Sequence, residues 1–158
     1  MKKEKVSEFT RKISQCNKSG LTLITYEILF AYLEEAEEAH REQEHELFRQ
    51  NIRKVLACLN RLMETLNFDY EISREIYPLY RFCRDEFGMA MAKNDMQNLE
   101  VVKRILKNLH EAFLEVSKED HSRPLMQNSE KVIAGMTYQK NDLTEIYDTD
   151  SENRGFFA

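Results

Sequence analysis

Glycine and proline are scarce in this chain, with four Gly and two Pro among 158 residues. Few breaks in regular structure are therefore expected. A content of 42% apolar and 32% charged residues is typical of a helical globular protein. The length fits one domain with a sizeable core, and no internal repeat of about 20–50 residues is visible.

An excess of positive charge is also missing. The chain has 23 basic and 28 acidic residues, for a formal net charge of −5. This balance argues against binding to nucleic acid or to an anionic membrane, because neutralising phosphates requires a concentrated basic patch. The three cysteines, Cys16, Cys58 and Cys83, lack paired spacing and fall within helical patterns. We expect free thiols that behave as small apolar side chains.

Long apolar runs are absent as well. The opening M-K-K-E-K-V-S-E-F has no apolar core of the kind that signal peptides contain. No run approaches the ~18 apolar residues of a membrane span. We therefore expect no membrane insertion and a location in the reducing cytoplasm.

Motifs that carry catalysis are nearly absent. The sequence contains no Gly-rich phosphate loop, no G-x-S-x-G and no C-x-x-C. Glu37 to His40 and Glu42 to His45 have the Glu-x-x-His spacing of di-metal carboxylate bundles, but those sites need such motifs on two different helices. Both copies here lie on one segment. We expect no catalytic residue, no metal and no cofactor, and a di-metal enzyme is kept only as a remote alternative.

Apolar periodicity predicts four long helices, over about 21–42, 46–66, 73–93 and 96–118. Short turns join them, so neighbours should be antiparallel. The predicted fold is all-α, an antiparallel up-down four-helix bundle. Apolar seams with bundle spacing in the last three helices comprise Phe48, Ile52, Val55, Leu59, Leu62 and Leu66; Ile76, Leu79, Tyr80, Cys83, Phe87 and Met91; and Leu99, Val102, Leu106, Leu109, Phe113 and Val116.

Two positions refine this prediction. Ser19 is a suitable N-cap for the first long helix. Pro78 lacks a backbone N–H and disfavours helical angles at the residue before it. We expect either a kink at Pro78 or a helix whose regular part begins there.

The two ends of the chain differ from the bundle. Residues 2–15 carry Val6, Phe9 and Ile13 at helical spacing, which predicts a short amphipathic helix that needs a surface to lie on. We divide the chain into a bundle domain over 1–120, including the N-terminal segment 1–16, and a partly ordered tail over 121–158. In the tail, Val132, Ile133 and Met136 predict one short helix. Phe156 and Phe157 are either a docking hook or a fortuitous ending.

The first long helix has two apolar stripes, whereas a bundle helix needs one. We assign the inner stripe to the bundle core and leave the outer stripe to be covered by another part of the chain or by a partner. The inner stripe comprises Leu21, Ile24, Ile28 and Tyr32, followed by Ala36 and Ala39, and the outer stripe comprises Leu23, Tyr26, Phe30 and Leu33.

Several segments, in order, resemble a known family. T-Y-E-I-L-F-A-Y-L-E-E-A over 25–36 is similar to the L-Y-D…F-L…A signature of the FliS family of flagellar export chaperones. L-N-F-D over 66–69 and L-Y-R-F-C over 79–83 resemble its L-D-F-E and L-Y-x-Y-M. A-K-N-D over 92–95, with the apolar series that ends in E-A-F at 111–113, resembles its A-N-x-x-D and the series ending in E-A-W. The sequence departs from the family pattern at two places. N-K-S-G over 17–20 stands where the family usually has Ser-Pro before the first long helix, and Pro78 interrupts a helix that is uninterrupted in the family.

The resemblance, which runs from about 21 to 116, implies a helical bundle that binds the C-terminal region of newly made flagellin in the cytoplasm. Such a protein keeps flagellin unpolymerised and passes it to the export apparatus. On this interpretation the outer stripe Leu23, Tyr26, Phe30 and Leu33 is the client surface, and Val6, Phe9 and Ile13 cover it until the client arrives. Alternatively, the stripe is simply buried by the chain's own ends. A helical adaptor with another client and a homodimer through the same groove remain open.

Overall fold

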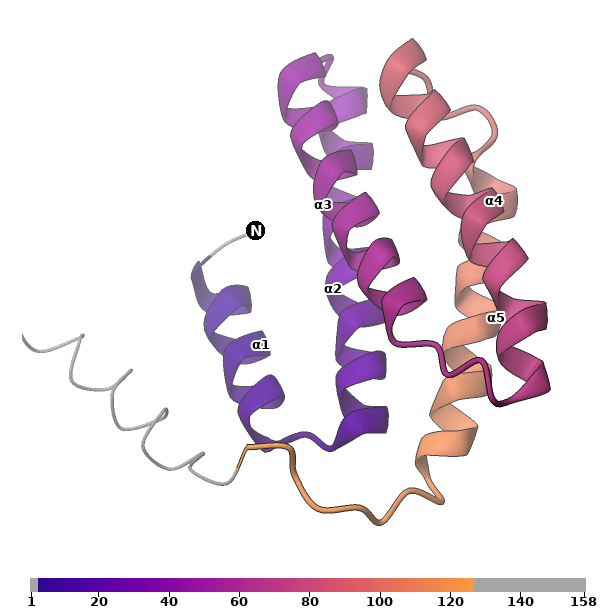
Figure 1. The fold of residues 1–158 in the computed structure, drawn as a ribbon. Coiled ribbons are helices and arrows are strands. Elements are labelled where there is room, and N and C mark those ends of the chain that lie inside the picture. The colour runs from indigo at the N-terminus through magenta and orange to yellow at the C-terminus, as the bar shows by residue number, and fades with distance from the viewer. Residues whose placement is uncertain (1–2, 127–158) are drawn as a thin grey trace, which may run out of the picture. The chain divides into compact units, whose positions relative to one another are not determined.

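The computed structural model describes residues 3–126, and these form helices joined by short connections, with no strand in this range (Figure 1). The helices are α1 (Lys3–Gln15), α2 (Lys18–Arg41), α3 (His45–Glu64), α4 (Glu71–Lys93) and α5 (Leu99–Ser117). Helices α2 to α5 form the predicted antiparallel up-down bundle. Helix α1 is the short N-terminal helical segment, and it packs on α2.

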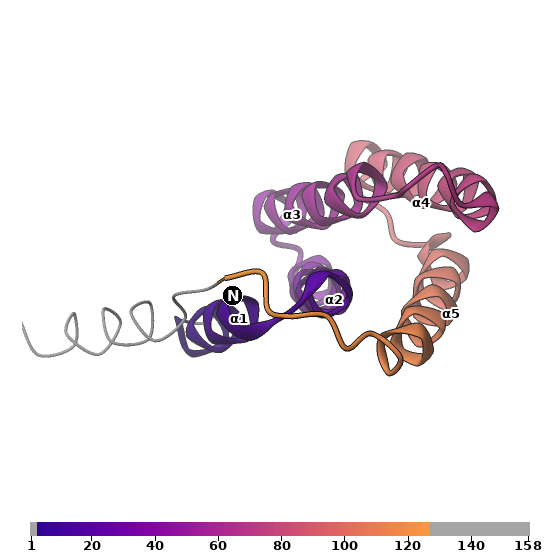
Figure 2. The ribbon, with the colours of Figure 1, turned by 60° about the horizontal axis from the view of Figure 1, so that its bottom comes forward.

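Contacts at the two ends of α2 follow from the up-down order. At the start of α2, the Asn17 side-chain amide donates to the Asp120 carbonyl oxygen just after α5, at 3.1 Å. At its end, His40 Nε2 lies 3.2 Å from the carbonyl oxygen of Asn94, which closes α4. Helices α2 and α5 are therefore antiparallel, whereas α2 and α4 point the same way (Figures 1 and 2).

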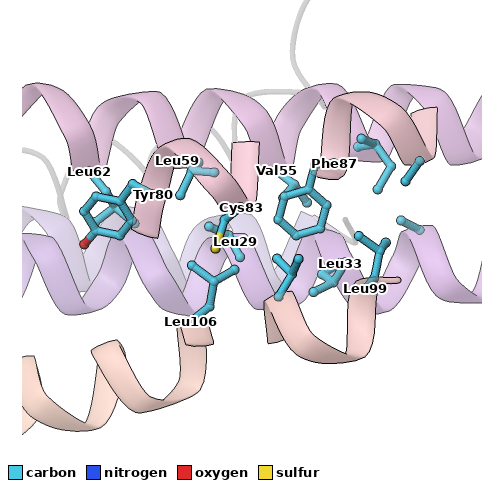
Figure 3. Packing of buried hydrophobic residues seen from close by; sticks show 14 of the residues in the cluster. Leu29, Leu33, Val55, Leu59, Leu62, Tyr80, Cys83, Phe87, Leu99 and Leu106 are labelled. Carbon is cyan, nitrogen blue, oxygen red and sulfur yellow. The ribbon is translucent and has the colours of Figure 1, made fainter. Parts of the chain in front are cut away.

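Except for Leu79, which is 40% exposed, the predicted seams of α3 and α4 meet in or against the core together with the first half of the α5 seam (Figure 3). Burying each large side chain contributes roughly 1.5–3 kcal/mol, so these seams provide most of the driving force for bundle formation. The seam residues with no more than 2% of their surface exposed are Phe48, Ile52, Val55, Leu59, Leu62, Tyr80, Cys83, Phe87, Leu99, Val102 and Leu106.

The assignment of the two α2 stripes is wrong for the first half of the helix and for Leu33. Tyr26 and Leu33 of the supposed outer stripe lie in the core, 0% and 3% exposed. Ile24 is also buried but lies outside the core cluster. It shares a helical face with Glu27, whose carboxylate bonds Lys12 of α1 at 2.8 Å. Helix α1 therefore covers part of the face that was assigned to the bundle, whereas Tyr32 packs against the core and Ala36 and Ala39 lie in it, as expected.

The start of α2 differs from expectation, and the start of α4 excludes one of the two alternatives given for Pro78. The N-cap of α2 is Asn17, whose Oδ1 accepts from the Gly20 N–H at 2.9 Å, and Ser19 lies inside the first turn. Helix α4 begins at Glu71, so its regular part does not start at Pro78. Ile76, before the proline, already reaches the core, and this packing holds the first turns helical. The predictions for Val132, Ile133, Met136, Phe156 and Phe157 lie outside the described residues.

Candidate functional site

The apolar seam of α5 continues beyond the region that the other helices cover. Leu99, Val102 and Leu106 are buried, Leu109 and Phe113 are half-buried, and Val116 is 65% exposed. The periodicity is unbroken along this series, so the change comes from the surroundings and not from the sequence of α5. One end of the bundle thus presents core-like side chains without a complete set of neighbours.

Leu109, Phe113 and Val116 line a cleft of about 530 Å³, which we call the end groove. It lies between the start of α2, the α3–α4 connection, the start of α4 and the second half of α5. Lys18 and Glu75 are its charged lining residues. The principal apolar lining residues are Leu66, Tyr70, Ile72, Leu79, Phe113 and Val116.

An aromatic cluster lies behind the groove. The Tyr26 ring centroid is 6.0 Å from that of Phe113, a groove-lining residue, and 5.5 Å from that of His110. Phe30 stacks on Tyr26 at 6.2 Å and meets the His110 ring edge-on at 5.8 Å. The groove wall on α5 is therefore held from behind by α2.

The four predicted client contacts do not share one exposed surface. Leu23 and Phe30 are half-buried, whereas Tyr26 and Leu33 belong to the core. The structure brings Tyr26 and Phe30 together, but it places only Leu23 and Phe30 within partial reach of solvent.

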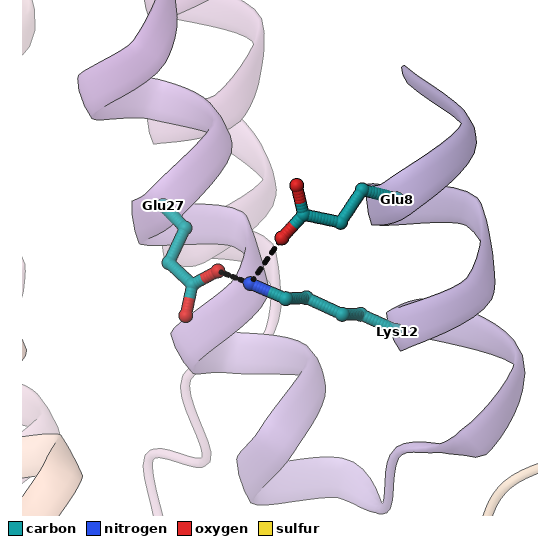
Figure 4. A network of polar contacts seen from close by, with 3 residues as sticks. All are labelled: Glu8, Lys12 and Glu27. Atoms are coloured by element: carbon teal, nitrogen blue, oxygen red, sulfur yellow. Dashed lines mark hydrogen bonds and ion pairs between the residues drawn. The ribbon is translucent and has the colours of Figure 1, made fainter. Parts of the chain in front are cut away.

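The predicted cover residues lie on α1, against the other face of α2. Phe9 and Ile13 are half-buried and Val6 is 48% exposed. Lys12 is bonded to the carboxylates of Glu27 and Glu8, and these contacts raise the pKa of its ammonium group (Figure 4). The expectation that α1 lies over Tyr26 and Phe30 is therefore wrong, because α1 packs on the side of α2 that faces away from the bundle.

A polar pair is enclosed within the core. The hydroxyl oxygens of Tyr26 and Tyr80 are 2.5 Å apart, and both side chains are fully buried. Burial raises the pKa of both phenols, and that of Tyr80 reaches about 12. Each hydroxyl thus satisfies the other in a region without solvent, which ties α2 to α4.

We expect these two phenols to ionise late in an alkaline titration. Their folded-state pKa values exceed the ordinary value of 10.0. Burial therefore favours the neutral form, and this contribution to stability is present below pH 10 and lost as the pH rises to about 12 and beyond. Tyrosinate absorbance measures this without interference, because the chain has no Trp. Tyr80→Phe should shrink the late step, and an unchanged late step in this variant would contradict the assignment.

The two Glu-x-x-His motifs take part in structural contacts. Glu37 pairs with Lys103, and His40 packs on Phe48 with ring centroids 5.3 Å apart. His45 Nδ1 lies 2.5 Å from the Asn94 side-chain amide. Between residues 3 and 126, no group of three or more His, Cys, Asp or Glu side chains could hold a metal ion. In the same range, no helix is both long and apolar enough to cross a membrane.

Sequence reasoning missed the groove residues of the α3–α4 connection. The stretch 67–72 is predicted to be a turn, yet Tyr70 and Ile72, which line the end groove, are 64% and 57% exposed, and neighbouring Phe68 is 46% exposed. Three large apolar side chains in six residues are unusual for a turn whose only role is connection. This concentration was the available signal for a binding surface.

The fold and the end groove together define an all-helical bundle with an unfilled apolar groove, an architecture suited to receiving a peptide helix. Residues 2–120 match the model of the family described as flagellar protein FliS, and the chain belongs to this family. The family supports a flagellar chaperone role, and it is a chaperone family rather than an enzyme family. The comparison with curated proteins gives no match.

Proposed function

We propose that this protein is a cytoplasmic export chaperone without enzymatic activity. It binds the C-terminal region of flagellin, prevents premature polymerisation and assists delivery to the flagellar export apparatus. The observation that carries the proposal is the end groove, where the α5 seam continues to Val116 without neighbours that bury it. Membership of the FliS family supplies the class of partner. The client segment would order as an amphipathic helix with its apolar face in the groove.

The exposed groove residues can provide a useful binding energy. Tyr70, Ile72 and Val116 each have more than half of their surface exposed, at 64%, 57% and 65%. Burying one such apolar side chain contributes roughly 1.5–3 kcal/mol. Ordering a disordered client costs about 2–5 kcal/mol or more. Several anchors are therefore needed for a stable complex, and the balance still allows release at the export apparatus.

The α2 residues predicted as client contacts keep a place in this proposal. Leu23 and Phe30 are half-buried and do not line the end groove, so they would touch the part of a client that extends beyond it. Tyr26 and Leu33 would act from beneath, because they hold the core against which α5 and the groove wall rest. Residues of α2 that contact the client would thus alternate with residues that support the groove wall.

Isothermal titration calorimetry of the whole chain with a peptide from the C-terminal region of flagellin tests this function. We expect saturable binding at micromolar concentration and a negative heat-capacity change, because apolar surface is buried. A peptide of the same composition in scrambled order is the control. Absence of binding at micromolar concentration would exclude the flagellin client and favour an adaptor with another partner. Sedimentation under the same conditions would reveal a homodimer that competes for the groove.

We further propose that α1 is a removable cover. It is attached to one face of α2, through half-buried Phe9 and Ile13 and the Lys12–Glu27 pair. Displacing it would uncover Ile24 and neighbouring apolar residues, which extend the surface available to a client.

Deleting residues 1–16 is therefore expected to tighten flagellin binding by about 10-fold, because the part of the client that extends beyond the end groove onto this face of α2 no longer has to displace α1. In the full chain, Phe9→Ser combined with Ile13→Ser should reproduce the effect. Val6→Ser, at an exposed position, is the matched control and should leave the dissociation constant unchanged. Unchanged or weaker binding of the shortened chain would contradict the cover role.

A further inference from the structure

The segment that follows α5 crosses to the connection between α1 and α2 (Figure 2). We call residues 118–126 the strap and Cys16 and Asn17 the joint. The joint contains all of the chain between α1 and α2, so its geometry sets the direction in which α1 leaves α2. Any segment that holds these two residues in place therefore also holds the start of α2 and the end of α1 at a fixed angle.

The strap is bonded to both joint residues. The Leu125 N–H donates to the Cys16 carbonyl oxygen at 3.0 Å. The Asn17 side-chain amide donates to the Asp120 carbonyl oxygen at 3.1 Å and to that of Ser122 at 3.5 Å. The same Asn17 side chain caps α2 through its Oδ1. The Asn17 side chain therefore connects the start of α2 to the strap.

Asp120 connects the strap to the first turn of α2. Its carboxylate accepts from the Ser19 hydroxyl and from the Ser122 N–H, the latter at 3.0 Å. Bonds from Ser122 and Ser19 lower the pKa of this carboxyl group to about 2, so it is charged at neutral pH. Helix α2 has no acidic residue in its first turn, whereas α1, α3, α4 and α5 each have one. The strap supplies the negative charge that stabilises a helix start.

Helix α1 depends on this fastening because its own attachment to α2 is small, consisting of half-buried Phe9 and Ile13 and two ion pairs. It has 13 residues, which is too short for a stable isolated helix in water. Among the described helices it packs on α2 alone. Its ion pairs to α2, Lys12–Glu27 and Lys5–Glu34, are partly or largely exposed and are therefore weak.

We infer that the strap is a latch, in which the contact of Asp120 with Ser19 and the bonds to the joint hold α1 closed over α2. Opening the latch frees α1 while the bundle α2–α5 stays folded. The latch itself is a property of the chain alone. Only its consequence, control of client access from the segment after α5, rests on the proposed function.

Hydrogen–deuterium exchange of the full chain, without client, tests the latch. In Asp120→Ala, the α1 amides should exchange about 10-fold faster or more, the size expected for losing a hydrogen bond to a charged group. Amides of α3, α4 and α5 should keep their rates. Glu119→Ala, at the exposed neighbouring position, is the matched control and should exchange like the original chain.

Ser19→Ala breaks the same contact from the other side and should give the same pattern. The double variant should then exchange little faster than either single variant, because both remove one interaction. Unchanged α1 rates, an equal acceleration in all helices, or additive effects in the double variant would each overturn the latch. Since no flagellin is present, this result is independent of whether the proposed client binds.

Discussion

The Tyr26→Ala variant is expected to lose about 3–5 kcal/mol of unfolding free energy, the range for removing a large aromatic side chain from a core. Tyr26 is fully buried and packs against Phe30, His110 and Phe113. Removing its ring leaves a cavity between α2 and α5. It also leaves the Tyr80 hydroxyl without its partner. Urea denaturation followed by circular dichroism measures the change.

Two matched variants separate the contributions to this loss. Tyr26→Phe keeps the ring and should cost about 1–3 kcal/mol, the penalty for a buried hydroxyl left unsatisfied at Tyr80. Tyr70→Ala removes the same kind of side chain at a 64% exposed position and should change stability by less than about 0.5 kcal/mol. If Tyr26→Ala were as stable as Tyr70→Ala, Tyr26 would lie at the surface, as the sequence-based assignment had it.

The Ile72→Asp variant is expected to bind the flagellin C-terminal peptide about 10–100-fold more weakly, because one buried apolar anchor is lost. Its carboxylate would in addition lose water on binding, which increases the penalty. Ile72 lines the end groove and is 57% exposed in the free protein, so the free fold should tolerate the change. Calorimetric titration gives the dissociation constant, and urea denaturation verifies the stability.

Val101→Asp is the matched control for this prediction. Val101 is an apolar residue of α5 with 45% exposure, and it does not line the end groove. Its replacement should leave the affinity for flagellin unchanged. Equal weakening by both variants would indicate a general effect of negative charge, and an unaffected Ile72→Asp variant would place the client elsewhere.

The core of α3, α4 and the first half of α5 could be predicted from sequence. Each of these helices has one apolar seam, and a single seam has one way to face a bundle. The burial of Phe48, Tyr80 and Leu106 therefore agrees with the prediction from sequence. Helix α2 is different because both of its faces are apolar. Helical periodicity finds two stripes but contains no information on which neighbour each one meets.

The end groove could not be predicted for a related reason. The spacing from Leu99 to Val116 identifies residues that can be buried, but burial depends on how far the facing helices extend. The α2 cap was missed because Ser19 and Asn17 are both good capping residues. The selection between them is made by Asp120, which is far away in sequence and bonds Ser19 instead. Long-range contacts of this kind leave no local pattern.

The strap also determines the order in which parts of the protein can fold during synthesis. Ser19 and Asp120 are separated by 101 positions, so their contact requires nearly the whole bundle sequence to be present. During synthesis α1 and α2 leave the ribosome first, but the joint between them cannot be fastened until residue 125 has followed. Closing so long a loop is slow compared with forming a helix. Every newly made copy therefore passes through a period in which its first helix is unfastened while the rest of the bundle assembles.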